Sequence, residues 1–277
     1  MEGTDQTFLD AFITLAAMAG ATKSIELGTA VLIPIRWPLK VAQNFASLSF
    51  LSGRKIHAGF GIGSNGQELA AAGFDVKNRE AIFIETLEIC HQVWETGTVN
   101  WHGEQFTIED VTLAPKPTSE IVTWYGGSTR AAVRRSVQYC EGWIPGRLPF
   151  PSFDNRIKYL RELDEAAGKK TKIGAIPVLF LDESREAARS KLDVTALAHS
   201  SEGSDRWLKP ASGEFERIED LEGLLIAGSI DECAEEIAKF AARGVDEFVF
   251  DLRLQFDRYE EILDRVGTEL LPKLRKL

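Results

Sequence analysis

Apolar residues along the chain follow two spacings, one typical of strands and one typical of helices. Short apolar runs such as SIELGTAVLIP, RKIHAGFGIG and IVTWYGG predict buried strands. Longer stretches with apolar residues every three or four positions, such as NREAIFIETLEICHQVWE, predict amphipathic helices. Strands are predicted to start near residues 25, 56, 121, 142, 173 and 246, with helical patterns between them. This alternation predicts a parallel sheet with right-handed crossover connections.

Two gaps between predicted strands are longer than a strand-helix-strand unit needs, which is about 30 residues. We expect insertions there, near residues 62–120, with a hairpin around His102 and Gly103, and near residues 195–225. Glycines and polar residues gather where the strands end, as they do in TIM-type barrels. We therefore predict a single barrel domain over residues 1–277. A closed barrel of this type has eight strands, whereas the pattern predicts six.

Composition and charge narrow the class of function. A net charge of −10 argues against a nucleic-acid partner or an anionic membrane surface. Uninterrupted apolar runs all fall short of the ~18 residues that a membrane-spanning helix needs. The start, MEGTDQTFLD, is acidic and polar, which is atypical of a signal peptide. We predict a cytoplasmic enzyme that acts on a small molecule.

The cysteines and histidines predict neither a disulfide nor a metal site. Cys90, Cys140 and Cys233 are far apart and odd in number, which indicates buried, inert thiols in a reducing compartment. The four histidines have no metal-ligand spacing with one another or with the cysteines. His57 lies in a predicted strand and is interpreted as a barrel-wall residue rather than a catalytic one.

The stretch WYGGSTRAAVRRSVQYCEGW, residues 124–143, carries the strongest candidate chemistry. Gly126 and Gly127 lie at a strand-to-helix turn, where glycine permits a close backbone approach. The helix that follows offers free N–H groups and the positive end of its dipole. Ser128 and Thr129 can cap this helix and donate to a phosphate oxygen. Its arginines are Arg130, Arg134 and Arg135. A phosphate site and a plain strand, turn and solvated helix both fit these residues.

Several motifs in order, LGTAV, LSGRKIHAGFGIG, ETLEICHQVW and YGGSTRAAVRRSVQYCEGW, closely resemble the bacterial luciferase-like superfamily. These proteins are flavin- or deazaflavin-dependent oxidoreductases built on a TIM-type barrel. The resemblance runs from about Leu9 to the C-terminus. It implies an α/β fold, a TIM-type (β/α)8 barrel that is incomplete here, with about six parallel strands that correspond to the family's third to eighth. The family's first strand, first helix and second strand would precede residue 1.

The resemblance also implies a cofactor, either FMN or coenzyme F420. The cofactor phosphate is expected on the loop after the third predicted strand, and the ring against a strand bulge with a non-prolyl cis peptide at Ala30–Val31. The cofactor-binding residues expected from the family are Ala30, Val31, Gly61, Gly63, Ser64, Gln67, Gly126, Gly127, Ser128 and Thr129.

Two reactions follow from the two cofactors. With FMN the resemblance implies monooxygenation, which acts on paired donors with incorporation or reduction of molecular oxygen; with F420 it implies hydride transfer without oxygen. In some sugar-phosphate-oxidising deazaflavin relatives a glutamate stands where this chain has Ser64, which argues against that specific chemistry. The catalytic residues are unknown, because the family's acidic residue or histidine lies on strands that have no matching positions here. The alternative is a truncated, non-catalytic flavin-binding relative.

The resemblance further implies a homodimer that forms through the helices of residues 7–21 and 38–50. Both helices are strongly apolar for surface helices. We expect residues 199–222, which are polar and lie in a predicted insertion, to contribute to the substrate pocket.

Overall fold

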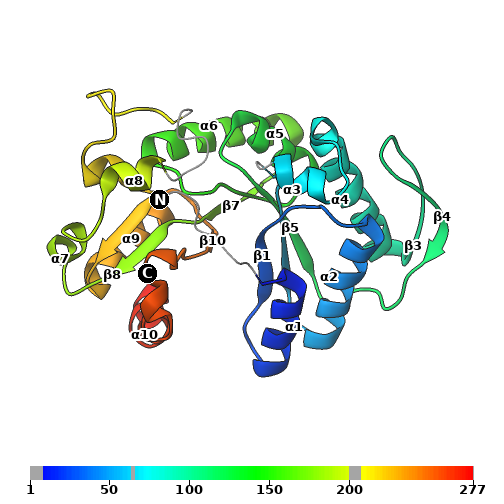
Figure 1. The fold of residues 1–277 in the computed structure, drawn as a ribbon, viewed down its shortest axis with the longest axis horizontal. Helices are drawn as coiled ribbons and strands as arrows, with labels where there is room; N and C mark the ends of the chain where they lie inside the picture. Colours follow the sequence, from blue (N-terminus) through cyan, green and yellow to red (C-terminus); the bar gives the residue numbers. More distant parts are fainter. Residues whose placement is uncertain (1–8, 64–65, 200–206, 277) are drawn as a thin grey trace. The chain divides into compact units, whose positions relative to one another are not determined.

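The computed structural model describes residues 9–63, 66–199 and 207–276, and the side chain of His199 is not described. The chain divides into two compact units. Unit 1 comprises Met1–Gly126 and Gln138–Gly142, and unit 2 comprises Gly127–Val137 and Trp143–Leu277. The main sheet has six strands in the order β1-β2-β5-β6-β7-β10 (Figure 1). The predicted α/β fold with about six parallel strands is confirmed.

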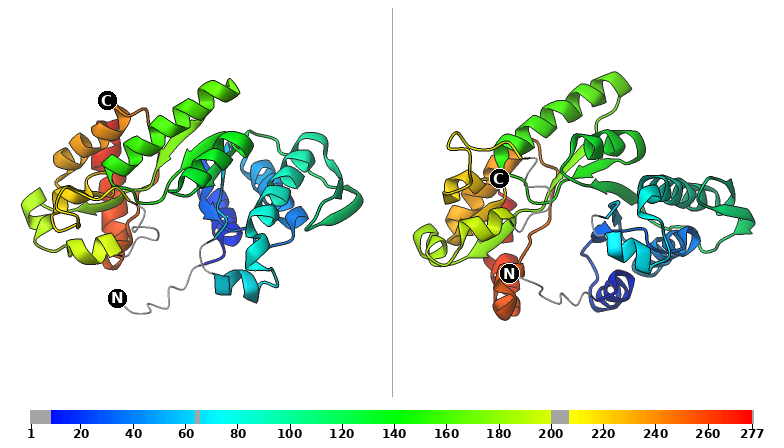
Figure 2. Two further views of the ribbon diagram at one scale, coloured as in Figure 1. Left: turned by 90° about the horizontal axis from the view of Figure 1, so that it is seen from above. Right: turned by 45° about the horizontal axis from the view of Figure 1, so that its top comes forward.

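Unit 1 contains three parallel strands of this sheet, and Leu27 pairs with Ile56, which in turn pairs with Ile121. The strands are β1 (Leu27–Leu32), β2 (Ile56–Phe60) and β5 (Ile121–Gly126). The helices are α1 (Ala11–Ala21), α2 (Pro38–Ser52), α3 (Gly66–Ala71), η1 (Val76–Asn78) and α4 (Arg79–Thr96). The predicted hairpin is confirmed as the antiparallel pair β3 (Thr98–His102) and β4 (Thr107–Thr112), which lies beside α4 (Figures 1 and 2).

The ends of the helices in unit 1 follow from local sequence. Helix α2 begins at Pro38, whose fixed φ suits a first helical position, and ends at Gly53 with a φ of 63°. Helix α4 ends in the same way, at Gly97 with a φ of 78°. Inside the unit, the ring of Phe83 meets the rings of Phe60 and Tyr125 edge to face.

Unit 2 contains most of α5, the end of β6 and the C-terminal half of the chain. Its strands pair as β7 with β10 and as β8 with β9, and both pairs are parallel. The strands are β6 (Gly142–Ile144), β7 (Lys172–Ala175), β8 (Val178–Leu181), β9 (Leu225–Gly228) and β10 (Glu247–Phe248). The helices are α5 (Arg130–Tyr139), α6 (Phe150–Ala167), α7 (Arg185–Arg189), α8 (Val194–His199), η3 (Ile218–Leu221), α9 (Ile230–Ala241), η4 (Arg253–Arg258), α10 (Tyr259–Arg265), the π-helix η5 (Val266–Leu270) and α11 (Leu271–Leu274).

The strand assignment in unit 2 requires three corrections. The single strand predicted to start near residue 173 is two strands, because the ladder of β7 ends before Pro177, which has no N–H to donate, and β8 begins after it. Strand β8 pairs with β9, a strand that was not predicted from the sequence. The strand predicted to start near residue 246 is reduced to Glu247–Phe248. The single barrel domain over residues 1–277, with insertions near residues 62–120 and 195–225, stays a prediction.

Among the helices of the described ranges, none is both long enough and apolar enough to cross a membrane.

Candidate functional site

The loop after β5 is held by contacts within unit 2. Gly127 has a φ of 149°, a conformation that favours glycine. Its carbonyl oxygen accepts a hydrogen bond from Nε1 of Trp143 at 2.8 Å. Thr129 caps α5, because its Oγ1 accepts from the backbone N of Ala132 at 3.1 Å. The loop is therefore fixed at the N-terminal end of a ten-residue helix, where backbone N–H groups and the helix dipole favour an anion.

Two arginines add positive charge beside this loop. Nε of Arg156, on α6, donates to the carbonyl oxygen of Ser128 at 3.0 Å. The guanidinium of Arg130 lies 3.8 Å from the centre of the Tyr159 ring, which also belongs to α6. Burial lowers the pKa of Arg156, and the charge of Arg130 lowers it further. Two cations that repel each other next to a helix N-terminus form a site that an anion would stabilise.

Only part of this cation group was predicted from the sequence. Arg130 was predicted, whereas Arg156, which is 28 residues from Ser128, was not. Helical pattern alone places Arg156 on a helix, and only the packing of α6 brings it to the loop. Arg134 was also named, and its side chain is exposed on α5.

In unit 1, the strand bulge expected at Ala30–Val31 is present. The peptide bond Ala30–Val31 is cis, as predicted. The pairing register of β1 with β2 shifts between Thr29 and Leu32. The hydroxyl of Thr29 donates to the carbonyl oxygen of Gly59 at 2.8 Å, which joins the bulge to β2.

Glycines on the neighbouring strands make room for the bulge. A Cβ on Gly59 would overlap the carbonyl oxygen of Thr29. A Cβ on Gly61 would lie 2.9 Å from Cγ2 of Val31, and a Cβ on Gly126 would lie 2.7 Å from its Cγ1. The Val31 side chain therefore fits only because these positions lack side chains, and 37% of Val31 remains exposed.

The other predicted cofactor residues lie beyond β2. Gly63 has a φ of 70°, and its carbonyl oxygen accepts from Nη1 of Arg79 at 3.5 Å. Gln67 is exposed on α3. Ser64 lies outside the described residues.

His57 is a satisfied strand residue, as interpreted from the sequence. Its Nε2 lies 2.7 Å from Oε2 of Glu26, and its Nδ1 accepts from Nε1 of Trp124 at 3.2 Å. The three cysteines are buried thiols, as predicted. Burial is the main cause that raises the pKa of Cys233 to about 12, which keeps this thiol protonated and unreactive.

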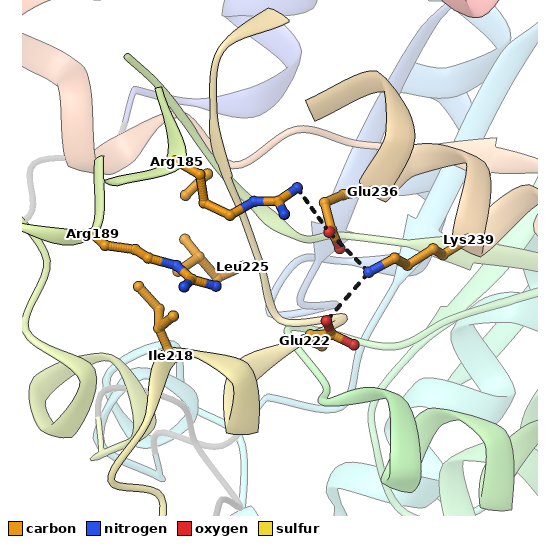
Figure 3. A pocket seen from close by; sticks show the side chains of 8 residues that line it. Arg185, Arg189, Ile218, Glu222, Leu225, Glu236 and Lys239 are labelled. Atoms are coloured by element: carbon orange, nitrogen blue, oxygen red, sulfur yellow. Dashed lines mark hydrogen bonds and ion pairs between the residues drawn. The ribbon is translucent and has the colours of Figure 1, made fainter. Parts of the chain in front are cut away.

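A small cavity in unit 2, of about 80 Å³, is lined mostly by charged side chains (Figure 3). Glu236 accepts from Arg185 at 3.2 Å and from Lys239 at 2.8 Å, and Lys239 also reaches Glu222 at 3.2 Å. Arg189 is paired with Glu219 outside the cavity at 2.8 Å. Because these charges neutralise one another, we interpret the group as an internal ion-pair network.

A larger cavity in unit 2, of about 300 Å³, lies beside the first turn of α6. Phe150 and Asp154 line it from α6, and Arg243 lines it from the end of α9. The remaining wall includes Leu208, Pro210, Phe215, Glu219, Asp220 and Glu222. Residues 208–222 of the predicted insertion therefore contribute to the wall of a cavity, although the role of the segment 199–222 in substrate binding stays a prediction.

Comparison with known proteins places the chain in a family. The model of the luciferase-like monooxygenase family matches residues 2–247. An F420-dependent glucose-6-phosphate dehydrogenase from Nakamurella multipartita is 27% identical over 280 residues, which cover 95% of this chain and 81% of that protein.

Two solved structures show the same fold. An F420-dependent secondary alcohol dehydrogenase has a TM-score of 0.73 and 20% identity, and the match covers 96% of this chain and 84% of that one. The oxygenating constituent of 3,6-diketocamphane monooxygenase from Pseudomonas putida, in complex with FMN, has a TM-score of 0.73 and 17% identity, with 95% and 83% covered. The family model, which matches most of the chain, and the shared fold lead to one conclusion: the chain belongs to the luciferase-like monooxygenase family.

Proposed function

We propose that this protein is an oxidoreductase that binds FMN or coenzyme F420 and acts on a small molecule. The observation that carries the proposal is the loop of residues 127–129, which lies at the N-terminus of α5 with Arg130 and Arg156 beside it. Both cofactors carry a phosphate, and a phosphate fits a site of helix N–H groups and guanidinium donors.

The chain's residues would hold the cofactor at two places. Gly127, Ser128 and Thr129 would hold the phosphate, with backbone N–H groups and hydroxyls as donors. The bulge at Ala30–Val31 would support the ring, since the exposed part of Val31 offers an apolar contact. Gly61 and Gly126 would keep that surface free of side chains. When bound, the cofactor would supply hydride transfer or, for FMN, oxygen activation, and the protein would orient it and exclude water.

The relatives support both cofactors. The dehydrogenase that is similar over 95% of the chain is named as F420-dependent, and one structural neighbour was solved with FMN. Two reactions therefore belong to the proposal: hydride transfer with F420, and monooxygenation with FMN.

The test is a titration of the purified protein with FMN and, separately, with F420, followed by cofactor absorbance and fluorescence. We expect saturable binding of one cofactor. Gly127→Asp should weaken it by about tenfold or more, because it places a side chain at a φ of 149° and a negative charge beside the phosphate. Gly267→Asp is the matched control, since a Cβ at Gly267 meets open space. If neither cofactor binds the unaltered protein, the proposal is wrong.

We further propose that the protein forms a homodimer through α1 and α2. Ile13 and Met18 on α1 are 74% and 43% exposed, and Phe50 and Leu51 on α2 are 54% and 70% exposed. Exposed apolar side chains gathered on two helices that contact each other are typical of interaction surfaces. A cytoplasmic location stays a prediction.

A further inference from the structure

Two arginines and one aspartate meet where strands of unit 2 end. Arg147 lies three residues beyond the end of β6, Asp251 lies three residues beyond the end of β10, and Arg253 is the first residue of η4. The Asp251 carboxylate contacts both guanidinium groups. In barrels of parallel strands, binding and catalytic side chains gather at the carboxyl ends of the strands. The three residues therefore occupy the edge of the sheet where a substrate is expected.

Asp251 is a fixed and buried member of this group. Its backbone N donates to the carbonyl oxygen of Pro177 at 3.0 Å, and its own carbonyl oxygen accepts from Leu179 at 3.0 Å. Its side chain is 8% exposed. Oδ1 accepts from the backbone N of Arg253 at 3.2 Å and from its Nε at 2.8 Å. The carboxylate is thus engaged mainly with Arg253.

Arg147 is far less satisfied. Its Nε lies 3.9 Å from Oδ2 of Asp251, which is too long for a hydrogen bond. Within the described ranges its guanidinium donates no hydrogen bond, although its side chain is only 16% exposed. A guanidinium has five N–H donors, and leaving them without partners in a half-buried position is costly.

The side chain of Arg147 nevertheless keeps 16% of its surface exposed. Its nitrogens are not among the fully buried polar atoms without a partner, which over the described part of the chain belong to Arg54, Thr86, Gln92 and Trp207. Burial lowers the pKa of Arg147, and the charge of Arg253 lowers it further, while Asp251 opposes these effects. Arg147 therefore carries a positive charge that its surroundings compensate incompletely and that a ligand can reach.

We propose that Arg147 and Arg253 bind an oxyanion group of the substrate, a carboxylate or a phosphate. Two guanidinium groups against one carboxylate leave one positive charge uncompensated, and an oxyanion would neutralise it. The planar guanidinium fork of Arg147 matches the oxygens of either group. This inference rests on the proposed function, because it assigns the substrate class of that oxidoreductase: small molecules with an anionic group.

The test uses inorganic phosphate as the probe and isothermal titration calorimetry as the readout. Phosphate can also occupy the loop of residues 127–129, so the titrations are made in a Gly127→Asp background. In that background we compare Arg147→Met, Arg253→Met and, as the matched control, Arg275→Met, which alters an exposed arginine of the same unit. Acetate titrated in place of phosphate then shows which oxyanion the site prefers.

We expect Arg147→Met and Arg253→Met each to weaken phosphate binding by about tenfold or more, and Arg275→Met to change it by less than about twofold. Thermal melting checks the fold, and Arg253→Met keeps the test decisive if Arg147→Met does not fold, since the Arg253 side chain is 48% exposed. Equal affinity in all variants, or no phosphate binding in the background itself, would overturn the proposal. Failure of the cofactor titration refutes the proposed function instead, so the two failures are read from different measurements.

Discussion

The buried carboxylate of Glu85 makes a sharp prediction about the hairpin of unit 1. Glu85 lies on α4 and is 8% exposed. Its Oε2 accepts from Nε1 of Trp101 at 3.1 Å and from the backbone N of Phe106 at 3.0 Å. Its Oε1 accepts from the backbone N of Glu104 at 2.9 Å and of Gln105 at 3.0 Å. One side chain thus satisfies four donors in and beside the turn between β3 and β4.

The cost of losing this carboxylate can be worked out from its partners. A hydrogen bond to a charged group contributes about 1.5–3 kcal/mol, but several bonds to one group are not additive. Glu85→Ala leaves all four donors without their acceptor, and breaking a buried charged interaction costs about 3–5 kcal/mol. We expect that cost for opening the hairpin turn. Glu85→Gln keeps one carbonyl oxygen and turns an NH₂ group toward the other two donors, so about 2–3 kcal/mol is expected.

Hydrogen exchange followed by mass spectrometry measures this local opening at the amides of residues 104–106. A loss of about 3 kcal/mol raises their exchange rates about 100-fold, since 1.36 kcal/mol corresponds to a factor of ten. Glu109→Ala is the matched control. Glu109 lies on the same hairpin, but its side chain is 68% exposed and pairs with exposed His102, at 3.6 Å. We expect the control to change exchange by less than about threefold.

Two results would refute the reasoning. If Glu85→Ala accelerates exchange by less than about tenfold, the carboxylate is not what holds the turn. If Glu85→Gln lowers the free energy of opening the hairpin turn as much as Glu85→Ala does, the retained carbonyl oxygen does not stabilise the turn, and the four hydrogen bonds are not what holds it.

Three further predictions follow from other sites. Arg156→Met should weaken cofactor binding by about tenfold in absorbance titrations, and Arg134→Met, which alters an exposed arginine, by less than about twofold. Lys191→Met should destabilise the protein at pH 7 but not at pH 2 in urea melts, because Lys191 holds the pKa of Asp182 below its usual 3.8 and that contribution is lost as pH falls through the folded-state pKa. Ile13→Glu should shift the protein from dimer to monomer in light scattering, whereas an unchanged mass would contradict the α1–α2 interface.

The elements that the sequence predicted well depend on neighbours close in the chain. Pro38 and Gly53 bound α2 because each acts through its own backbone. Ser229 caps α9 and forms a capping box with Glu232, a pattern that spans only four residues. Strand β9 was missed because its four residues pair with β8, more than forty residues earlier, and lie between a polar segment and a capped helix.

The candidate site also has parts that the local sequence predicts and parts that it does not. The loop of residues 127–129, which we propose as the phosphate site, was predicted because glycine, hydroxyl and helix follow one another directly in residues 126–139. The bulge at Ala30–Val31 was expected only from the family resemblance. Its room comes from Gly59, Gly61 and Gly126 on two other strands, so no local pattern in β1 indicates it. Arg156 and Arg147 were not predicted as site residues, because each is brought to its site by contact with a residue on another element.

Two carboxylates that accept from backbone N–H groups show which contacts can be predicted from the sequence and which cannot. Glu232 accepts from the backbone N of Ser229, three residues earlier, and this contact is the main reason that its pKa is lowered. The spacing of serine and glutamate in the sequence predicts that contact. Glu85 accepts hydrogen bonds from amides 19 to 21 residues later, across a helix end and a strand, and no local pattern in its helix distinguishes it from Glu88. The chemistry is identical in both cases. The difference is that the fold, rather than the local chain, brings the donors to Glu85. Residues of this kind are therefore identified from the packing in the structure, and their role is tested by measuring local opening of the segment that they hold.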